Sequence, residues 1–121
     1  MARIMIADDS ESVRLMLRDI LEAGKHKVVG EAVDGADTIV KFESTKPDVL
    51  LLDVGMPKKD GVETLVEIMK YNPKAKVVMI TAHDDMELIE NCVKIGAFGY
   101  ITKPFDNEDI LQIVHYAFEE E

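Results

Sequence analysis

Polar side chains able to do chemistry follow short apolar runs at several points of the chain. Three carboxylates, a hydroxyl and an ammonium group stand where such runs end: Asp8, Asp9, Asp53, Thr81 and Lys103. An acidic pair at a helix start is more often explained by the helix dipole than by a site. Asp53 is harder to explain in that way, because a charge that closes a buried strand needs a partner.

Brought together, these side chains would form a pocket with excess negative charge. Three carboxylates against one lysine leave about two uncompensated charges, which a hard divalent cation would neutralise. Magnesium suits the pocket because Mg²⁺ binds a few carboxylate oxygens and keeps several waters. The metal can bring a phosphoryl donor to the carboxylates, and an aspartate can attack phosphorus to form an acyl phosphate. Thr81 and Lys103 are placed to stabilise the charge on the phosphoryl oxygens.

The apolar runs alternate with segments of helical periodicity, and this alternation predicts the fold. The run Val49-Leu50-Leu51-Leu52 is typical of a strand covered on both faces of a parallel sheet. Five strand–helix units in strict order predict an α/β fold, a (βα)5 three-layer sandwich. Its functional crevice would lie at the carboxyl ends of the strands. The expected strands are Ile4–Ala7, Val28–Val33, Val49–Asp53, Val77–Thr81 and Phe98–Thr102.

Three of the helical segments have a clear apolar face. We expect the first to be capped by Ser10 or Ser12, whose hydroxyls suit a helix start. The residues expected to face inward are Val13, Met16, Leu17, Ile20 and Leu21 in the first helix, Leu88, Ile89, Cys92 and Val93 in a later one, and Ile110, Val114, Ala117 and Phe118 in the last. His26 and His115 are predicted to be surface residues.

Length, charge and cysteine content narrow the class of protein. The 121 residues suit one domain spanning 1–121, and no apolar run approaches the roughly 18 residues of a membrane span. The net charge of −10 disfavours nucleic acid and anionic lipid as partners and favours cations and basic protein surfaces. A single cysteine, Cys92, fits a reducing compartment, so we expect a cytoplasmic protein.

Four motifs, taken in order, resemble those of one known family. They are Ile-Met-Ile-Ala-Asp-Asp at 4–9, Leu-Leu-Asp-Val-Gly-Met-Pro at 51–57, Ile-Thr-Ala at 80–82 and Gly-Tyr-Ile-Thr-Lys-Pro-Phe at 99–105. Each is weak alone, but their order and spacing over the whole chain are highly specific. The chain is similar to response-regulator receiver domains, and most similar to the CheY-like single-domain group. The resemblance implies a parallel sheet of strand order 2-1-3-4-5.

The resemblance also implies a role for each matching position at the site. Asp53 would accept the phosphoryl group from a histidine kinase. Asp9 would ligate Mg²⁺ directly, Asp8 mainly through water, and Gly55 through its backbone carbonyl. The chain would be a signalling phosphoacceptor and not an enzyme, catalysing only its own phosphorylation and dephosphorylation.

Three further residues would bind the phosphoryl group or change conformation in response to it. Thr81 would contact it and move toward it, while Lys103 would pair with its oxygens. Tyr100 would turn inward as Thr81 moves. Two positions depart from common patterns, Gly55 and His83, and both bear on how long the phosphoryl group would last.

Two other classes of protein share parts of this pattern. Phosphatases of the haloacid-dehalogenase type use an aspartyl phosphate with Mg²⁺, but they need a second aspartate where this chain has Gly55. Flavodoxin-like flavin carriers have a phosphate loop rich in Ser, Thr and Gly, whereas Asp-Asp-Ser-Glu at 8–11 would repel phosphate. A receiver that is never phosphorylated is disfavoured because all five key residues are present.

Output is expected through contact with another protein, since the chain ends with the last helix. The exposed stripe of the helix after Asp84-Asp85 would be Glu87, Glu90, Asn91 and Lys94. Together with Tyr100, it is expected to meet a basic surface of a motor switch or adaptor protein, resembling archaeal chemotaxis regulators. The alternative is a phosphorelay intermediate that passes the phosphoryl group onward. We expect a monomer.

Overall fold

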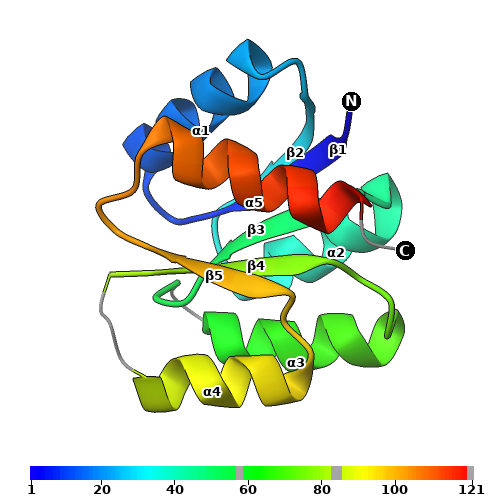
Figure 1. The fold of residues 1–121 in the computed structure, drawn as a ribbon. Helices are drawn as coiled ribbons and strands as arrows, with labels where there is room; N and C mark the ends of the chain where they lie inside the picture. Colours follow the sequence, from blue (N-terminus) through cyan, green and yellow to red (C-terminus); the bar gives the residue numbers. More distant parts are fainter. Residues whose placement is uncertain (57–58, 83–85, 120–121) are drawn as a thin grey trace.

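Five parallel strands form a single sheet with helices on both faces (Figure 1). The computed structural model describes residues 1–56, 59–82 and 86–119. The strand order is β2-β1-β3-β4-β5, which confirms the predicted fold. The elements in chain order are β1 (Arg3–Ala7), α1 (Glu11–Ala23), β2 (Lys27–Ala32), α2 (Gly35–Thr45), β3 (Val49–Asp53), α3 (Gly61–Tyr71), β4 (Val77–Thr81), α4 (Met86–Ile95), β5 (Gly99–Thr102) and α5 (Asn107–Glu119).

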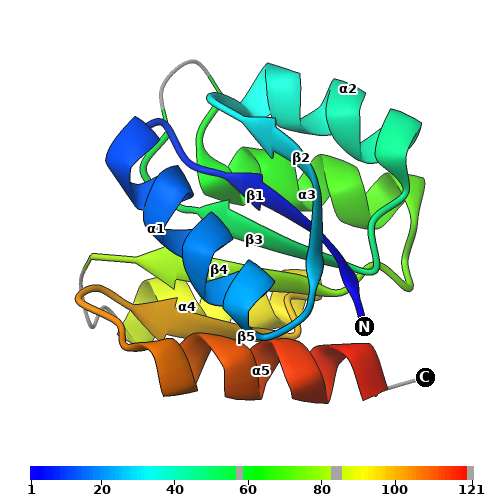
Figure 2. The same ribbon diagram turned by 90° about the horizontal axis from the view of Figure 1, so that it is seen from above.

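The central strand β3 divides its side chains between two separate cores. Val49 and Leu51 pack with the layer of α1 and α5, whereas Leu50 and Leu52 pack with the layer of α2, α3 and α4. Figure 1 shows the sheet between these two layers, and Figure 2 looks down on the sheet with α1 in front of it. All five β3 residues are buried, and each fully buried leucine contributes about 1.5–3 kcal/mol of transfer free energy. The strand that carries Asp53 is therefore held from both sides.

Side-chain caps start the helices next to the carboxyl edge of the sheet. Ser10 caps α1 by accepting from the Val13 N–H, so of the two predicted candidates Ser10 is the cap. Asp34 caps α2 in the same way. Asp60 and Glu63 form a reciprocal capping box at the start of α3. These caps satisfy amide groups that the first helical turn leaves open.

Three residues predicted to face inward are exposed instead. Met16 and Val93 are 52% exposed, and Phe118 is 38% exposed. Each is one position away from a buried neighbour, beside Leu17, Cys92 and Ala117 respectively. Because one residue advances a helix by about 100°, a side chain at the margin of an apolar stripe turns outward. No helix in the described ranges has both the length and the apolar character needed to cross a membrane.

His26 is half-buried, so its prediction as a surface residue is wrong. Its Nδ1 accepts the Ala2 N–H at 3.1 Å, just before β1. Burial lowers the pKa of His26, and the Met1 ammonium group and His115 lower it further. Because Nδ1 accepts a hydrogen bond, the contact requires the neutral ring, and the lowered pKa favours this form.

We expect acid to weaken the fold through His26. A lowered pKa in the folded state means that the contribution is complete above the unfolded value of about 6.5 and is lost as pH falls below it. His26→Asn keeps a neutral acceptor near the Nδ1 position, so its melting temperature should fall less than that of the parent between pH 7 and pH 5. Thermal melts against pH test this. His115→Asn should keep most of the parent's dependence on pH, because His115 is the smallest of the three causes that lower the pKa of His26. Parallel curves for the parent and His26→Asn would contradict it.

Candidate functional site

The five polar residues singled out in the sequence lie at the carboxyl edge of the sheet. Asp8 follows β1, Asp53 ends β3, Thr81 ends β4 and Lys103 follows β5. Register brings these ends together: Ala7 pairs with Leu52, Asp53 with Ile80, and Thr81 with Thr102. The parallel topology therefore places side chains that are far apart in the sequence at one edge.

Asp8, Asp9 and Asp53 form a cluster of carboxylates. One oxygen from each lies within 4.8 Å of the other two. Asp8 and Asp53 are buried, whereas Asp9 is exposed to solvent. The cluster is thus open on one side, and its geometry allows three oxygens to meet one ion.

The ammonium group of Lys103 lies beside these carboxylates. Its Nζ lies 3.3 Å from Asp8 Oδ2 and 3.6 Å from Asp53 Oδ1. Its backbone N–H donates to the Thr81 carbonyl at 2.7 Å, which ties the end of β5 to β4. The peptide bond between Lys103 and Pro104 is cis. The hydrogen bond to Thr81 holds the Lys103 backbone, and the side chain points toward two of the three acids.

The charge on Asp53 is disfavoured by its surroundings. Burial raises the pKa of Asp53, and the nearby Asp8 and Asp9 also raise it, while Lys103 and the Gly55 N–H act in the opposite direction. All the side-chain atoms that could bind a metal here are carboxylate oxygens, and the three carboxylates carry two more negative charges than Lys103 balances. Both features fit a small divalent cation such as Mg²⁺. A bound cation would relieve the repulsion that burial makes costly.

Asp8 is held by contacts from three directions. Its Oδ1 accepts the Ser10 N–H at 2.9 Å, and its own N–H donates to the Ala32 carbonyl at 3.0 Å. Its carbonyl accepts from Arg14 Nη1 at 2.8 Å. Arg14 does not stand out in the sequence, although its place in the first helix after the acidic pair puts it within reach of Asp8.

Two glycines flank the acceptor in different ways. A Cβ on Gly61 would lie 2.5 Å from the Asp53 carbonyl oxygen, so only glycine allows α3 to begin so close to β3. A Cβ on Gly55 would meet no atom of the described residues, which leave out 57 and 58, within 4 Å. The Gly55 N–H lies 3.4 Å from Asp53 Oδ1. Gly61 is thus required by packing, although the sequence marks it only as part of a turn before this helix, whereas no described residue fills the space beside Gly55.

A small cavity separates Thr81 from Tyr100. It has a volume of about 10 Å³ and is also lined by Leu88, Val93 and Val54, among others. That volume admits about one water molecule, far less than a phenol ring. Tyr100 lines this cavity and is 40% exposed, so its ring could fill the space only after the walls of the cavity move.

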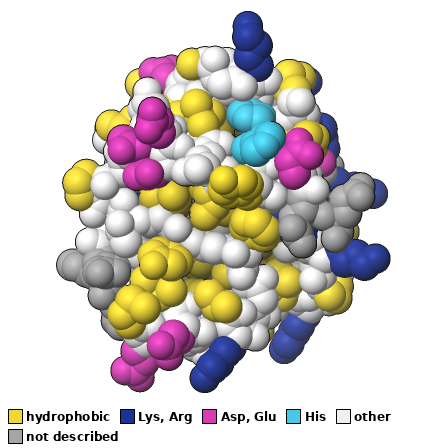
Figure 3. All heavy atoms as spheres, viewed as in Figure 1, with side chains coloured by type: hydrophobic (Ala, Val, Ile, Leu, Met, Phe, Trp, Pro, Cys, Tyr) yellow, Lys and Arg dark blue, Asp and Glu magenta, His cyan; other side chains and the backbone are white. Residues whose placement is uncertain are grey.

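The residues expected to form the partner stripe are at the surface. Glu87, Glu90, Asn91 and Lys94 are exposed and line a shallow groove along α4. A second groove, between β5 and α5, is lined by Tyr100 and Tyr116. Figure 3 shows hydrophobic side chains gathered over the middle of this face, with charged side chains around them. His83, Asp84 and Asp85 lie outside the described residues.

Comparison with known proteins places the chain in a family. The family model of the response regulator receiver domain matches residues 4–115. CheY chemotaxis proteins of several bacteria are 33% to 36% identical to the chain. The archaeal Chemotaxis protein CheY of Halobacterium salinarum is 34% identical over 93% of this chain and 92% of its own. Protein CcdB of Bacillus subtilis, which is not named for chemotaxis, is 34% identical over 94% of this chain and 95% of its own.

A solved structure shows the same arrangement. The structure of the CheX-CheY-BeF3-Mg+2 complex from Borrelia burgdorferi matches with a TM-score of 0.93 and 32% identity, over 96% of this chain and 88% of that one. The match to the family model and the likeness to this solved structure agree on the fold. The chain belongs to the response regulator receiver domain family.

Proposed function

We propose that this chain is a phosphoacceptor switch of two-component signalling. An Asp53 carboxylate oxygen attacks the phosphorus of a phosphohistidine on a histidine kinase, the P–N bond breaks, and the imidazole leaves with its electron pair. One observation carries the proposal: the buried Asp53 carboxylate lies within 4.8 Å of oxygens from Asp8 and Asp9 and 3.6 Å from Lys103 Nζ. Haloacid-dehalogenase chemistry is disfavoured because Gly55 has no side chain to act as an acid.

The residues around Asp53 would divide the work of binding. Mg²⁺, when bound, would supply charge neutralisation between the carboxylates and the incoming phosphoryl oxygens. Asp8, Asp9, Asp53 and the Gly55 carbonyl would hold it. The presence of Mg²⁺ in the Borrelia complex supports this assignment. Lys103 would pair with a phosphoryl oxygen, and the Thr81 hydroxyl would bind another.

The switch would connect Thr81 to Tyr100. The phosphoryl group adds about −1.5 to −2 charges and would draw Thr81 toward Asp53. That movement would enlarge the cavity between the two residues, and Tyr100 could then turn inward. The small volume of the cavity supports this order of events, because the ring does not fit first.

Thr81→Ala is expected to separate phosphorylation from signalling. The variant should still accept a phosphoryl group on Asp53. It should lose the gain in partner affinity, because alanine has no hydroxyl to bind the phosphoryl group and move toward it. Phosphorylation measured by mass spectrometry and partner binding measured on the same sample would test this. A normal gain in affinity would reject the coupling, whereas Thr81→Ser should retain it.

Output would occur through the α4–β5–α5 face, in chemotaxis or motility. The CheY names of many relatives, and CheX in the Borrelia complex, support a protein partner. The acidic residues Glu87 and Glu90 favour a basic motor-switch or adaptor surface. The second candidate function is transfer of the phosphoryl group onward in a phosphorelay. Protein CcdB, a relative that is not named for chemotaxis, supports a role outside chemotaxis. We further propose a monomeric receiver domain over 1–121 that acts in the cytoplasm.

Incubation with acetyl phosphate tests the proposed function directly. We expect the intact protein to gain the mass of one phosphoryl group when Mg²⁺ is present and to remain unmodified when EDTA is added. Peptide mapping after borohydride reduction should place the group on Asp53. Equal modification in EDTA, or modification at another acid, would reject the mechanism.

A further inference from the structure

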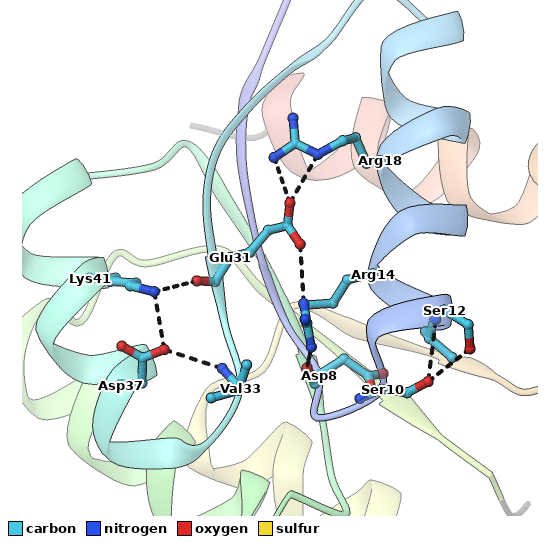
Figure 4. A network of polar contacts seen from close by, with 10 residues as sticks. Asp8, Ser10, Ser12, Arg14, Arg18, Glu31, Val33, Asp37 and Lys41 are labelled. Atoms are coloured by element: carbon cyan, nitrogen blue, oxygen red, sulfur yellow. Dashed lines mark hydrogen bonds and ion pairs between the residues drawn. The ribbon is translucent and has the colours of Figure 1, made fainter.

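A network of charged side chains joins α1 to β2 beside the acidic cluster (Figure 4). The Glu31 carboxylate accepts from Arg14 Nε at 3.1 Å and from Arg18 Nε and Nη2 at 2.9 and 2.5 Å. Burial would raise the pKa of Glu31, but the hydrogen bonds from Arg18 and Arg14 outweigh burial and lower it. Glu31 is therefore an ionised anchor for both arginines at neutral pH.

The two arginines differ in their second contact. Arg14 Nη1 donates to the Asp8 carbonyl at 2.8 Å, whereas Arg18 Nη1 donates to Glu22 on its own helix at 3.2 Å. The Arg14 side chain is 14% exposed and that of Arg18 is 34% exposed. Arg14 thus bridges β2 and the backbone of the metal site, while Arg18 does not.

The carbonyl that Arg14 contacts belongs to the peptide between the two acidic residues. This peptide is planar, so fixing the Asp8 oxygen also fixes the Asp9 N–H and the direction of the chain at Asp9. The Asp8 side chain is held separately by Ser10 and Lys103. Asp9 is exposed, so the position of its carboxylate depends on this backbone direction.

We propose that Arg14, anchored by Glu31, is a positioning residue that places Asp9 for the metal. The inference rests on the metal site of the proposed function. The planar guanidinium reaches Glu31 through one nitrogen and Asp8 through another, a fork that a lysine cannot reproduce. The network continues to α2, because Lys41 donates to the Glu31 carbonyl at 2.7 Å and to Asp37 at 3.1 Å. Both sides of β2 therefore support the anchor.

The direction of the expected effect separates positioning from simple electrostatics. Arg14 is a cation near the site, so its charge alone opposes a divalent ion, and removing that charge would tighten Mg²⁺ binding. Loss of positioning would weaken it. Outer contacts that orient metal ligands typically account for about 10–100-fold in affinity.

A Mg²⁺ titration of the unphosphorylated protein, followed by ¹H–¹⁵N NMR spectra, tests the proposal. Arg14→Lys keeps the charge and should raise the Mg²⁺ Kd about tenfold or more. Arg14→Gln should also raise it. Arg18→Gln is the matched control: it removes two hydrogen bonds to Glu31 and none to Asp8, and should leave the Kd within about twofold.

Three results would overturn the proposal. They are an unchanged Kd for Arg14→Lys, a tighter Kd for Arg14→Gln, and an equal weakening by Arg18→Gln. A purely structural role would lower the melting temperature of the metal-free variants without changing the Kd. Glu31→Gln, which leaves Arg14 in place, should raise the Kd in the same direction and serves if the Arg14 variants do not fold. Absence of Mg²⁺ binding by the parent would instead reject the metal site of the proposed function.

Discussion

Asp53→Asn is expected to abolish phosphoryl labelling while making the metal-free protein more stable. Labelling is lost because an amide has no carboxylate oxygen to attack phosphorus. The pKa of Asp53 is higher in the folded protein than in the unfolded chain. Ionisation of Asp53 therefore lowers the free energy of unfolding as pH rises above the pKa of the unfolded chain. A neutral side chain of the same shape removes that cost at pH 7.

Magnesium is expected to reverse the order of the two melting temperatures. A ligand at a hundred times its Kd adds about 2.7 kcal/mol to the native state, which corresponds to a shift on the order of 10 °C for a domain of this size. The parent should show this shift, and Asp53→Asn should show little of it. Labelling and thermal melts, each with Mg²⁺ and with EDTA, measure both effects.

Asp60→Asn is the matched control for this experiment. Asp60 is an exposed helix cap near the site, and asparagine caps helices about as well as aspartate. This variant should label normally and respond to Mg²⁺ like the parent. Labelling of Asp53→Asn at the parent's rate, or equal Mg²⁺ shifts for both variants, would contradict the assignment of Asp53.

Reversing two charges on α4 is expected to remove the partner. Glu87→Lys together with Glu90→Lys places two cations where the proposed basic surface would dock. Like charges across an interface cost several kcal/mol, so affinity should fall at least tenfold, which is about 1.4 kcal/mol. Affinity of the parent should also fall as salt rises, and the variant should lose this dependence.

The measurement uses phosphorylated protein and partners captured from the native organism, identified by mass spectrometry and then assayed with purified components. Asp19→Lys together with Glu43→Lys changes the net charge equally on exposed positions of α1 and α2 and should retain binding. Both double variants should label on Asp53 like the parent. Undiminished affinity of the α4 variant would show that its acidic residues serve only solubility.

Much of the architecture could be predicted from the sequence because the three central strands are covered on both faces. Such a strand is apolar along its length and ends at a polar residue. A run such as Val49–Asp53 therefore stands out, and its ends are well defined. Observed strand bounds lie within one residue of the expected ones. The parallel order then places Asp8, Asp53 and Thr81 at one edge without further information.

The remaining features depend on contacts that periodicity does not describe. Met16, Val93 and Phe118 stand at the margins of helical stripes, where the packing of the neighbouring element decides exposure. The contact between Arg14 and Glu31 joins residues 17 positions apart on different elements. His26 meets the backbone of Ala2 only because β1 and β2 lie side by side.

The contrast between the two glycines around Asp53 bears on how this protein can diverge. A side chain at position 61 would collide with the backbone of β3, so a substitution there would disturb the fold. A side chain at position 55 would begin beside the carboxylate without meeting any of the described residues within 4 Å. Mutation at position 55 can therefore change the access of water to the acceptor while the fold stays intact. A substitution at position 55 could therefore lengthen or shorten the proposed signal without loss of the fold.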